Sequence, residues 1–137
     1  MDHPTRFSAY LAQDGDPQPV IAQALRFTRR FLPQSGLDAR GKVKLAIIVE
    51  ELVSNSLRHG GMPRAACLML VLSPGDAGVH LSIRDNGDPF DPTAPAPFDG
   101  PDPVSGGGVG LTIVRAWGEG ISYERKDGSN SMTLLVR

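Results

Sequence analysis

The sequence places a carboxylate and a carboxamide one helical turn apart. Within the apolar segment 45–61, LAIIVEELVSNSLRHGG, Glu51 precedes Asn55 by four positions. Side chains at this spacing lie on the same side of a helix, close enough to share one ligand. An asparagine oxygen suits Mg²⁺, and a glutamate nearby can act as a general base. The pair therefore predicts either metal-assisted chemistry or an ordinary polar helix surface.

The helical phase separates Glu51 from its neighbour Glu50. At about 100° per residue, the apolar positions of this segment define a buried arc. The arc consists of Leu45, Ile48, Val49, Leu52 and Val53. Glu51 and Asn55 lie together at one border of the arc, whereas Glu50 and Ser54 lie farther toward solvent. Glu51 is therefore predicted to be the functional carboxylate.

A second candidate is Asp85-Asn86-Gly87, which follows an apolar strand pattern. A carboxylate at the end of a strand can accept a hydrogen bond from an exocyclic amine. Gly87 would let a flat ring approach the backbone closely. The same three residues are also good turn formers, and taken alone they favour an ordinary turn.

The third candidate is the glycine-rich segment 106–110, GGGVG, ahead of a predicted helix over 111–117. Glycines before a helix expose backbone N–H groups at the positive end of its dipole, where phosphate can bind. Flexible lids also end in glycines, so both interpretations stay open. The dinucleotide fingerprint is excluded because Leu111 stands where it needs glycine, and the Walker sequence Gly-Lys-Ser/Thr does not occur.

The three candidates lie on or between predicted helices and strands. The patterns predict a strand over 6–11, a helix over 20–32, and a second helix from an N-cap at Asp38 to about His59. They then predict a hairpin of strands 65–72 and 79–84. After the glycine-rich segment they predict a strand pair, 121–125 and 131–136, around a turn at 126–130. Residues 88–107 hold six of the twelve prolines, which indicates a lid or a disordered segment. The order predicts an α+β fold with a mixed, mainly antiparallel sheet and three helices on one face.

Length and composition limit the possible classes of protein. The 137 residues are expected to form a single domain, 1–137. The net charge is −1, and the Lys and Arg residues are spread along the chain rather than concentrated in one patch. This argues against a nucleic-acid-binding protein. No signal-peptide pattern and no apolar run of membrane-spanning length occurs, so the chain is expected to be cytoplasmic. The one cysteine, Cys67, lies in the apolar run 67–72 and is predicted to be a buried structural thiol.

Taken in order, three motifs resemble those of a known superfamily. The patterns Glu51-x-x-x-Asn55, Asp85-x-Gly87-x-Pro89-Phe90 and Gly106-x-Gly108-Val109-Gly110-Leu111 resemble the N, G1 and G2 boxes of the GHKL (Bergerat-fold) ATPases. The resemblance extends from the first predicted strand to the last and implies a Bergerat-type α/β sandwich with an ATP lid loop. The short chain and the segments EELVSNSLRHG and DNGDPFDP are most similar to bacterial anti-sigma-factor serine/threonine kinases of the RsbW/SpoIIAB type.

The resemblance implies a role for each motif. Asn55 would coordinate the Mg²⁺ that bridges the ATP phosphates, and Glu51 would be the catalytic base. Asp85 would accept a hydrogen bond from the adenine amine, with Gly87 beneath the ring. The third box would bind and close over the phosphates; it comprises Gly106, Gly108, Val109, Gly110 and Leu111. The family often has a Gly-Thr pair near the adenine, and Ser131 is the expected substitute for that threonine.

Two functions follow as hypotheses. The first is an anti-sigma factor that binds a sigma factor, forms a homodimer, and phosphorylates a STAS-domain antagonist with ATP. Glu51 favours this hypothesis, since nucleotide binding alone does not require a carboxylate beside the metal ligand. The second is an ATP-dependent protein-binding module without kinase activity. The ATPase part of a sensor histidine kinase is disfavoured, because none of the three histidines has the setting of a phospho-acceptor; these are His3, His59 and His80.

Overall fold

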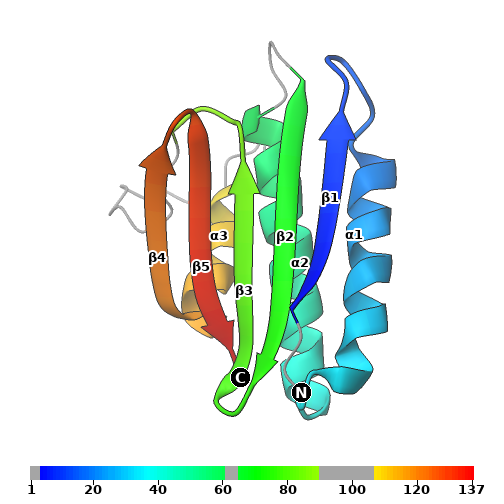
Figure 1. The fold of residues 1–137 in the computed structure, drawn as a ribbon, viewed down its shortest axis with the longest axis vertical. Coiled ribbons are helices and arrows are strands. Elements are labelled where there is room, and N and C mark those ends of the chain that lie inside the picture. Colours follow the sequence, from blue (N-terminus) through cyan, green and yellow to red (C-terminus); the bar gives the residue numbers. More distant parts are fainter. Residues whose placement is uncertain (1–3, 61–64, 90–106) are drawn as a thin grey trace.

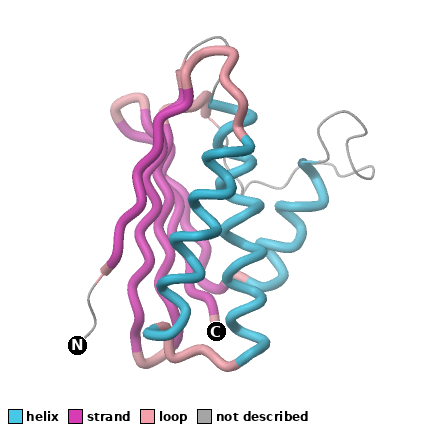
Figure 2. Tube along the Cα trace, turned by 90° about the vertical axis from the view of Figure 1, so that its right-hand side faces the viewer, coloured by secondary structure: helices cyan, strands magenta, loops and turns pink. Residues whose placement is uncertain are grey.

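The computed structural model describes residues 4–60, 65–89 and 107–137. They form two layers, a five-stranded sheet and a layer of helices that covers one of its faces (Figures 1 and 2). This arrangement confirms the predicted α+β class and the three helices on one face. The elements in order are β1 (Thr5–Leu11), α1 (Gln18–Phe31), the short 3₁₀ helix η1 (Leu32–Gln34), α2 (Ala39–Gly60), β2 (Ala66–Gly75), β3 (Gly78–Asp85), α3 (Gly107–Trp117), β4 (Glu119–Lys126) and β5 (Ser129–Val136).

The sheet has the strand order β1-β2-β3-β5-β4. Each of its four neighbouring pairs is antiparallel, so the sheet is more regular than the mixed, mainly antiparallel one that we expected. The helix α3 leads into β4, which lies at the far edge of the sheet. The β4–β5 hairpin then returns β5 to the side of β3 (Figure 1). None of the helices within the described ranges is long and apolar enough to cross a membrane.

The central helix α2 organises the core. It packs against α1 and α3 on its sides and against β2, β3 and β5 beneath. Its buried arc is the predicted one, with relative exposures of 0–3% for Leu45, Ile48, Val49, Leu52 and Val53. The helix begins where predicted, because the Asp38 Oδ1 atom accepts a hydrogen bond of 2.8 Å from the Gly41 backbone N–H.

Only one face of the sheet is covered, which decides where alternate strand residues point. In β2 the residues Ala66, Leu68, Leu70 and Leu72 are buried against the helices. Cys67 lies between two of them, points to the open face and is exposed. The prediction of a buried thiol is therefore wrong. The apolar run 67–72 suggested a strand covered on both faces, but successive side chains of a strand face opposite ways.

The β4–β5 hairpin is tighter than predicted. Its loop consists of Asp127 and Gly128 alone, with φ angles of 52° and 78°. Positive φ at both loop positions is typical of the type I′ turn, whose twist matches that of the flanking strands. Because the turn is this short, Asn130 belongs to β5 and pairs directly with Asp85 of β3.

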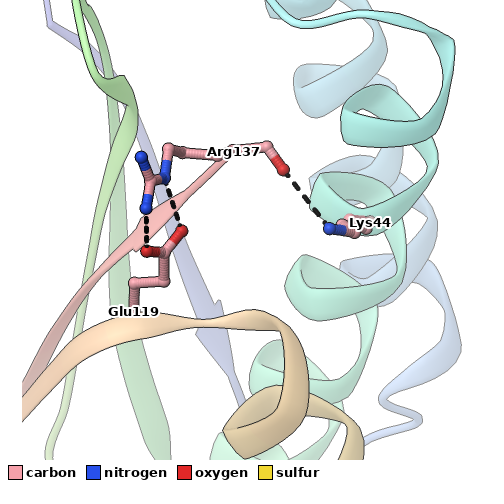
Figure 3. Close-up of polar contacts among 3 residues, drawn as sticks. All are labelled: Lys44, Glu119 and Arg137. Atoms are coloured by element: carbon pink, nitrogen blue, oxygen red, sulfur yellow. Dashed lines mark hydrogen bonds and ion pairs between the residues drawn. The ribbon is translucent and has the colours of Figure 1, made fainter.

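An ion pair ties the end of β5 to the start of β4, at the opposite end of the sheet from Asp85. Figure 3 shows the pair. The Arg137 Nε atom donates to Glu119 Oε2 at 2.7 Å, and its Nη2 atom donates to Oε1. This hydrogen-bonded guanidinium lowers the pKa of Glu119, and the carboxylate in turn raises the pKa of Arg137. Both groups are solvent-exposed, so the pair contributes little to stability.

The Arg137→Gln substitution tests the cause of this pKa shift. We expect the pKa of Glu119 to return upward to its ordinary range, as measured by carboxyl ¹³C NMR titration. Because the folded-state pKa of Glu119 is lowered, its stabilising contribution is present above the unfolded-state pKa and is lost as the pH falls through the folded-state value. The stability difference between the two proteins should therefore vanish in acid. An unchanged pKa in Arg137→Gln would show that another group causes the shift.

Candidate functional site

The C-terminal half of α2 carries Glu51 and Asn55 at the border between its buried and exposed sides. Both side chains are half-buried and Glu50 is exposed, as the helical phase predicted, whereas Ser54, which we expected farther toward solvent, is half-buried as well. Lys44 lies seven positions before Glu51 and therefore on the same stripe of the helix. Its Nζ atom donates to the backbone oxygen of Arg137 at the end of β5, 3.5 Å away (Figure 3). The stripe with Glu51 and Asn55 thus faces the β5 and α3 side of the helix.

Glu51 and Asn55 have free hydrogen-bonding capacity. Among the residues that the structure describes, neither side chain makes a hydrogen bond or an ion pair. An ionised carboxylate offers about four acceptor positions, and an amide oxygen offers two. These atoms are available to water, a metal ion or a ligand rather than committed to the fold.

Asp85, at the end of β3, differs from Glu51 and Asn55 because protein groups already donate hydrogen bonds to its carboxylate. Its Oδ2 atom accepts a hydrogen bond of 2.7 Å from the Ser56 hydroxyl on α2. Its Oδ1 atom accepts one of 2.9 Å from the Gly87 backbone N–H and another of 2.9 Å from the Asn130 Nδ2 atom on β5. Three donors from three parts of the chain therefore fix this carboxylate. One acceptor position, on Oδ2, remains for a ligand.

The turn after Asp85 is held from the other side by β2. The Asn86 Oδ1 atom accepts from the Cys67 backbone N–H at 2.8 Å, and its Nδ2 atom donates to the Ala65 carbonyl at 3.0 Å. The side chain thus satisfies backbone groups that the ladder leaves open at the end of the strand. Asn86 is therefore a turn residue, as its type suggested, and it orients Asp85 and the buried Gly87.

Asn130 joins β5 and β4 to this turn. Its Nδ2 atom also donates to the Asp88 carbonyl at 2.8 Å. Its Oδ1 atom accepts from the Tyr123 hydroxyl and, at 3.2 Å, from the Arg125 guanidinium. Arg125 donates in addition to the Gly87 carbonyl. In the described part of the chain, no buried side-chain polar atom lacks a hydrogen-bond partner. The network is therefore complete and rigid.

The structure does not bring Ser131 to this network. Side chains of β5 alternate, so Asn130, Met132 and Leu134 face the helices, whereas Ser131 faces the open side of the sheet. We had expected Ser131 near the adenine, but the β5 residue that lies beside Asp85 is Asn130. The error arose because the predicted turn at 126–130 left Asn130 outside the strand.

The sequence reasoning also missed four residues of the network: Ser56, Tyr123, Arg125 and Asn130. A signal existed for the first, since Ser56 falls within the buried arc of α2, and a buried hydroxyl requires a partner. A signal for Asn130 was its two-residue spacing from Met132 and Leu134. Tyr123 and Arg125 carry no comparable signal, because the sequence of β4 does not show which of its faces the helices cover.

The glycine-rich segment belongs to a helix rather than preceding it. The helix α3 begins at Gly107, not at Leu111 as predicted, so Gly108, Val109 and Gly110 form its first turn. The first four N–H groups of a helix lack intrahelical partners, and here they belong to Gly107, Gly108, Val109 and Gly110. Gly106 lies outside the described residues, as does the predicted lid, apart from Asp88, Pro89 and Gly107.

Three segments that are distant in sequence meet at one end of the molecule. The helix α2 runs toward this end, β3 finishes there, and α3 starts on the same side of the sheet (Figures 1 and 2). The Ser56–Asp85 hydrogen bond and the packing of α2 on α3 join the three. The arrangement combines a fixed acceptor, a free carboxylate–carboxamide pair and a helix N-terminus. These groups suit, respectively, an amine, a metal ion and an anion.

Comparison with known proteins agrees with this arrangement. The model of the histidine kinase-like ATPase domain matches residues 16–136. The chain belongs to the histidine kinase-like ATPase family. The serine/threonine-protein kinase BtrW of Bordetella bronchiseptica is 34% identical over 119 residues, which cover 84% of each chain. Membership confirms the ATPase superfamily that the three motifs predicted.

The donor chemistry of this ATPase domain fits a magnesium–nucleotide complex. Within the ranges that the structure describes, no three His, Cys, Asp or Glu residues cluster so as to hold a metal ion. A magnesium ion beside Asn55 would therefore need its other oxygens from phosphate and water, as Mg²⁺ commonly does. Asp85 has an acceptor position for an amine and Gly87 has no side chain to block a ring, so the residues present fit the nucleotide.

Two serine substitutions on α2 test how tightly Asp85 is held. In Ser56→Ala, the half-buried Asp85 carboxylate loses its hydroxyl donor, and we expect the free energy of unfolding to fall by about 1–2 kcal/mol in urea denaturation. Ser54→Ala is the matched control, because the Ser54 hydroxyl accepts a hydrogen bond from the exposed Arg58 on the same helix. Equal effects of the two substitutions would contradict a specific role for Ser56.

Proposed function

We propose that this ATPase domain is an ATP-dependent serine/threonine protein kinase of the anti-sigma-factor type. The observation that carries the proposal is the half-buried Glu51. It has no partner in the described chain and lies one turn from Asn55, on the helix whose Ser56 holds Asp85. A nucleotide-binding site needs no such carboxylate, whereas hydroxyl phosphorylation uses one as a base.

The adenine end of the proposed site is formed by Asp85 and Gly87. The remaining acceptor position on Asp85 Oδ2 takes the exocyclic amine, while the turn backbone at Gly87 lies beneath the ring. Because Ser56 and Asn130 hold the carboxylate in place before the nucleotide arrives, little side-chain entropy is lost on binding.

The phosphate end is formed by Asn55 and the start of α3. The Asn55 oxygen is the one protein ligand proposed for Mg²⁺, which neutralises phosphate charge when it is bound. The backbone N–H groups at Gly108, Val109 and Gly110, in the first turn of α3, offer donors to the phosphate oxygens at the positive end of the helix dipole, and Leu111 follows directly behind them. Gly106 is proposed to act with them as the hinge of the lid.

Glu51 is proposed to act on the protein substrate. Its carboxylate accepts the proton of the attacking serine or threonine hydroxyl as the new oxygen–phosphorus bond forms and the bond from the γ-phosphorus to the bridging oxygen breaks. ADP leaves with the electrons of that bond. Positioning of the hydroxyl and neutralisation of charge supply most of the acceleration in such transfers.

The partners are proposed from the family resemblance and from the relative. BtrW is named as a serine/threonine-protein kinase, which supports a protein substrate for this chain. We propose that the substrate is a STAS-domain antagonist and that the chain, as a homodimer in the cytoplasm, alternates between it and a sigma factor. The whole chain, 1–137, then acts as a single ATP-binding domain.

Nucleotide binding by the proposed site is tested with two substitutions. Asp85→Ala removes the amine acceptor and Asn55→Ala removes the metal ligand, so each should weaken Mg²⁺-dependent ADP binding by about tenfold or more in calorimetry. Ser82→Ala, on the open-face side of the same strand as Asp85, should bind as the wild type does. If both site variants retained wild-type affinity, the site assignment would be wrong.

Kinase activity is tested with neighbouring glutamates. We expect transfer of label from [γ-³²P]ATP to a STAS-domain protein to fall by about 10²–10⁴-fold in Glu51→Ala, because the hydroxyl loses its base. Glu50→Ala, one residue away on the exposed side, should transfer within about twofold of wild type. Nucleotide binding without any transfer to the STAS-domain proteins of the source genome would favour the binding-module function instead.

A further inference from the structure

The outer side of the helix layer carries a cluster of cations at the end of the molecule opposite Asp85. The last turns of α1 and the first turn of α2 run antiparallel and lie side by side there (Figures 1 and 2). The side chains of four arginines in these turns are exposed, and that of one lysine is half-buried. Together they form what we call the basic surface: Arg26, Arg29, Arg30, Arg40 and Lys42.

The fold gathers on this surface cations that are spread out along the sequence. Residues 17–49 hold six Lys or Arg residues and a single carboxylate, that of Asp38, which gives a net charge of +5. The whole chain has a net charge of −1, so the other residues together carry −6. The Asp38 carboxylate is already engaged, because it accepts a hydrogen bond from the Gly41 backbone N–H. The positive charge is therefore local to this part of an otherwise acidic chain.

The fold itself makes no use of these charges. Within the described ranges, none of the five side chains makes a hydrogen bond or an ion pair. The first turn of α2 contains Arg40 and Lys42 and no acidic residue. Cations at the N-terminus of a helix oppose its dipole and are destabilising. A charge arrangement that costs stability and pairs with nothing in the described chain points to carboxylates supplied by another molecule.

Apolar side chains lie next to the basic surface. Val43 is 57% exposed, and Leu25 and Ile47 are half-buried; all three lie outside the core cluster. Val43 and Ile47 are one turn apart on α2, and Leu25 is one turn from Arg29 on α1, so each helix combines apolar and basic or exposed positions on one side. Such a surface fits an amphipathic helix whose apolar side chains contact the apolar residues and whose carboxylates pair with the guanidinium groups.

We propose that the basic surface is a docking site for an acidic amphipathic helix of a partner protein. An extended polyanion such as DNA would also meet the rest of the chain, whose charge of −6 repels it. A short acidic helix contacts the local cations alone, and the exposed Val43 gives it an apolar contact that DNA would not use. Because this surface lies at the opposite end of the helix layer from Asp85, the docked partner leaves the nucleotide site open. The inference goes beyond the proposed function and does not depend on it.

The test uses a fluorescently labelled peptide of about 18 residues, with leucine at helical spacing and glutamate at the other positions. In fluorescence anisotropy at about 50 mM salt, we expect the wild type to bind it with a Kd of about 10–100 μM. Arg26→Gln/Arg29→Gln/Arg30→Gln should bind it about tenfold or more weakly, because three carboxylate partners are lost. Val43→Gln, which changes no charge, should bind it about threefold more weakly. Unchanged affinity in the triple variant would overturn the proposal.

The matched control removes the same number of charges from the open face of the sheet. Arg6→Gln/Arg84→Gln/Lys126→Gln alters exposed side chains there and should bind the peptide as the wild type does. Equal losses in the two triple variants would overturn the proposal, because binding would then follow net charge alone. Wild-type binding to duplex DNA or to vesicles that contain phosphatidylserine, without binding to the peptide, would overturn it as well.

The nucleotide site serves as the second measurement. Mg²⁺–ADP affinity in Arg26→Gln/Arg29→Gln/Arg30→Gln should stay within about twofold of the wild type, because these exposed side chains contact neither the site nor the core. A large loss of ADP affinity in this variant would contradict a separate docking surface. Wild-type protein that bound the peptide but no nucleotide would refute the proposed function and leave the docking site standing, so the two failures are distinguishable.

Discussion

The structure depends on the Asp85 carboxylate and on the three donors that it accepts. One donor comes from the central helix, one from the turn that follows the strand, and one from the neighbouring strand β5. Asp85 is half-buried, and a carboxylate that is partly withdrawn from water is costly unless such donors satisfy it, so the elements are constrained to meet at this point. The same interaction connects α2, with Glu51 and Asn55, to the end of the sheet.

The two halves of the site differ in how complete they are without a ligand. In the half around Asp85, protein donors fill all but one of the acceptor positions of the carboxylate, and Asn86 and Asn130 hold it from both sides. The half around Glu51 and Asn55 has no protein partners among the described residues. Such a division suits a site in which the base is recognised by a preformed surface and the phosphates and metal ion complete the remainder.

The single covered face of the sheet explains where the remaining polar residues lie. Side chains on the helix side either join the core or, at the Asp85 end, join the network. Alternate residues, including Cys67 and Ser131, face the open side. A site residue on the helix side must therefore lie an even number of positions from the residues of its strand that face the helices. Asp85, Asn130 and Arg125 meet this condition.

The sequence by itself determined the helices and strands and which side chains lie together on one element. Apolar periodicity predicted the helices and strands, the Asp38 cap and the choice of Glu51 over Glu50, because these depend on neighbours within a turn or along a strand. The pairing of Asp85 with Asn130 was decided only by the tertiary structure, since residues 45 positions apart meet through the β3–β5 register. The exposure of Cys67 was decided in the same way, because which face of a strand is buried depends on where the helices pack.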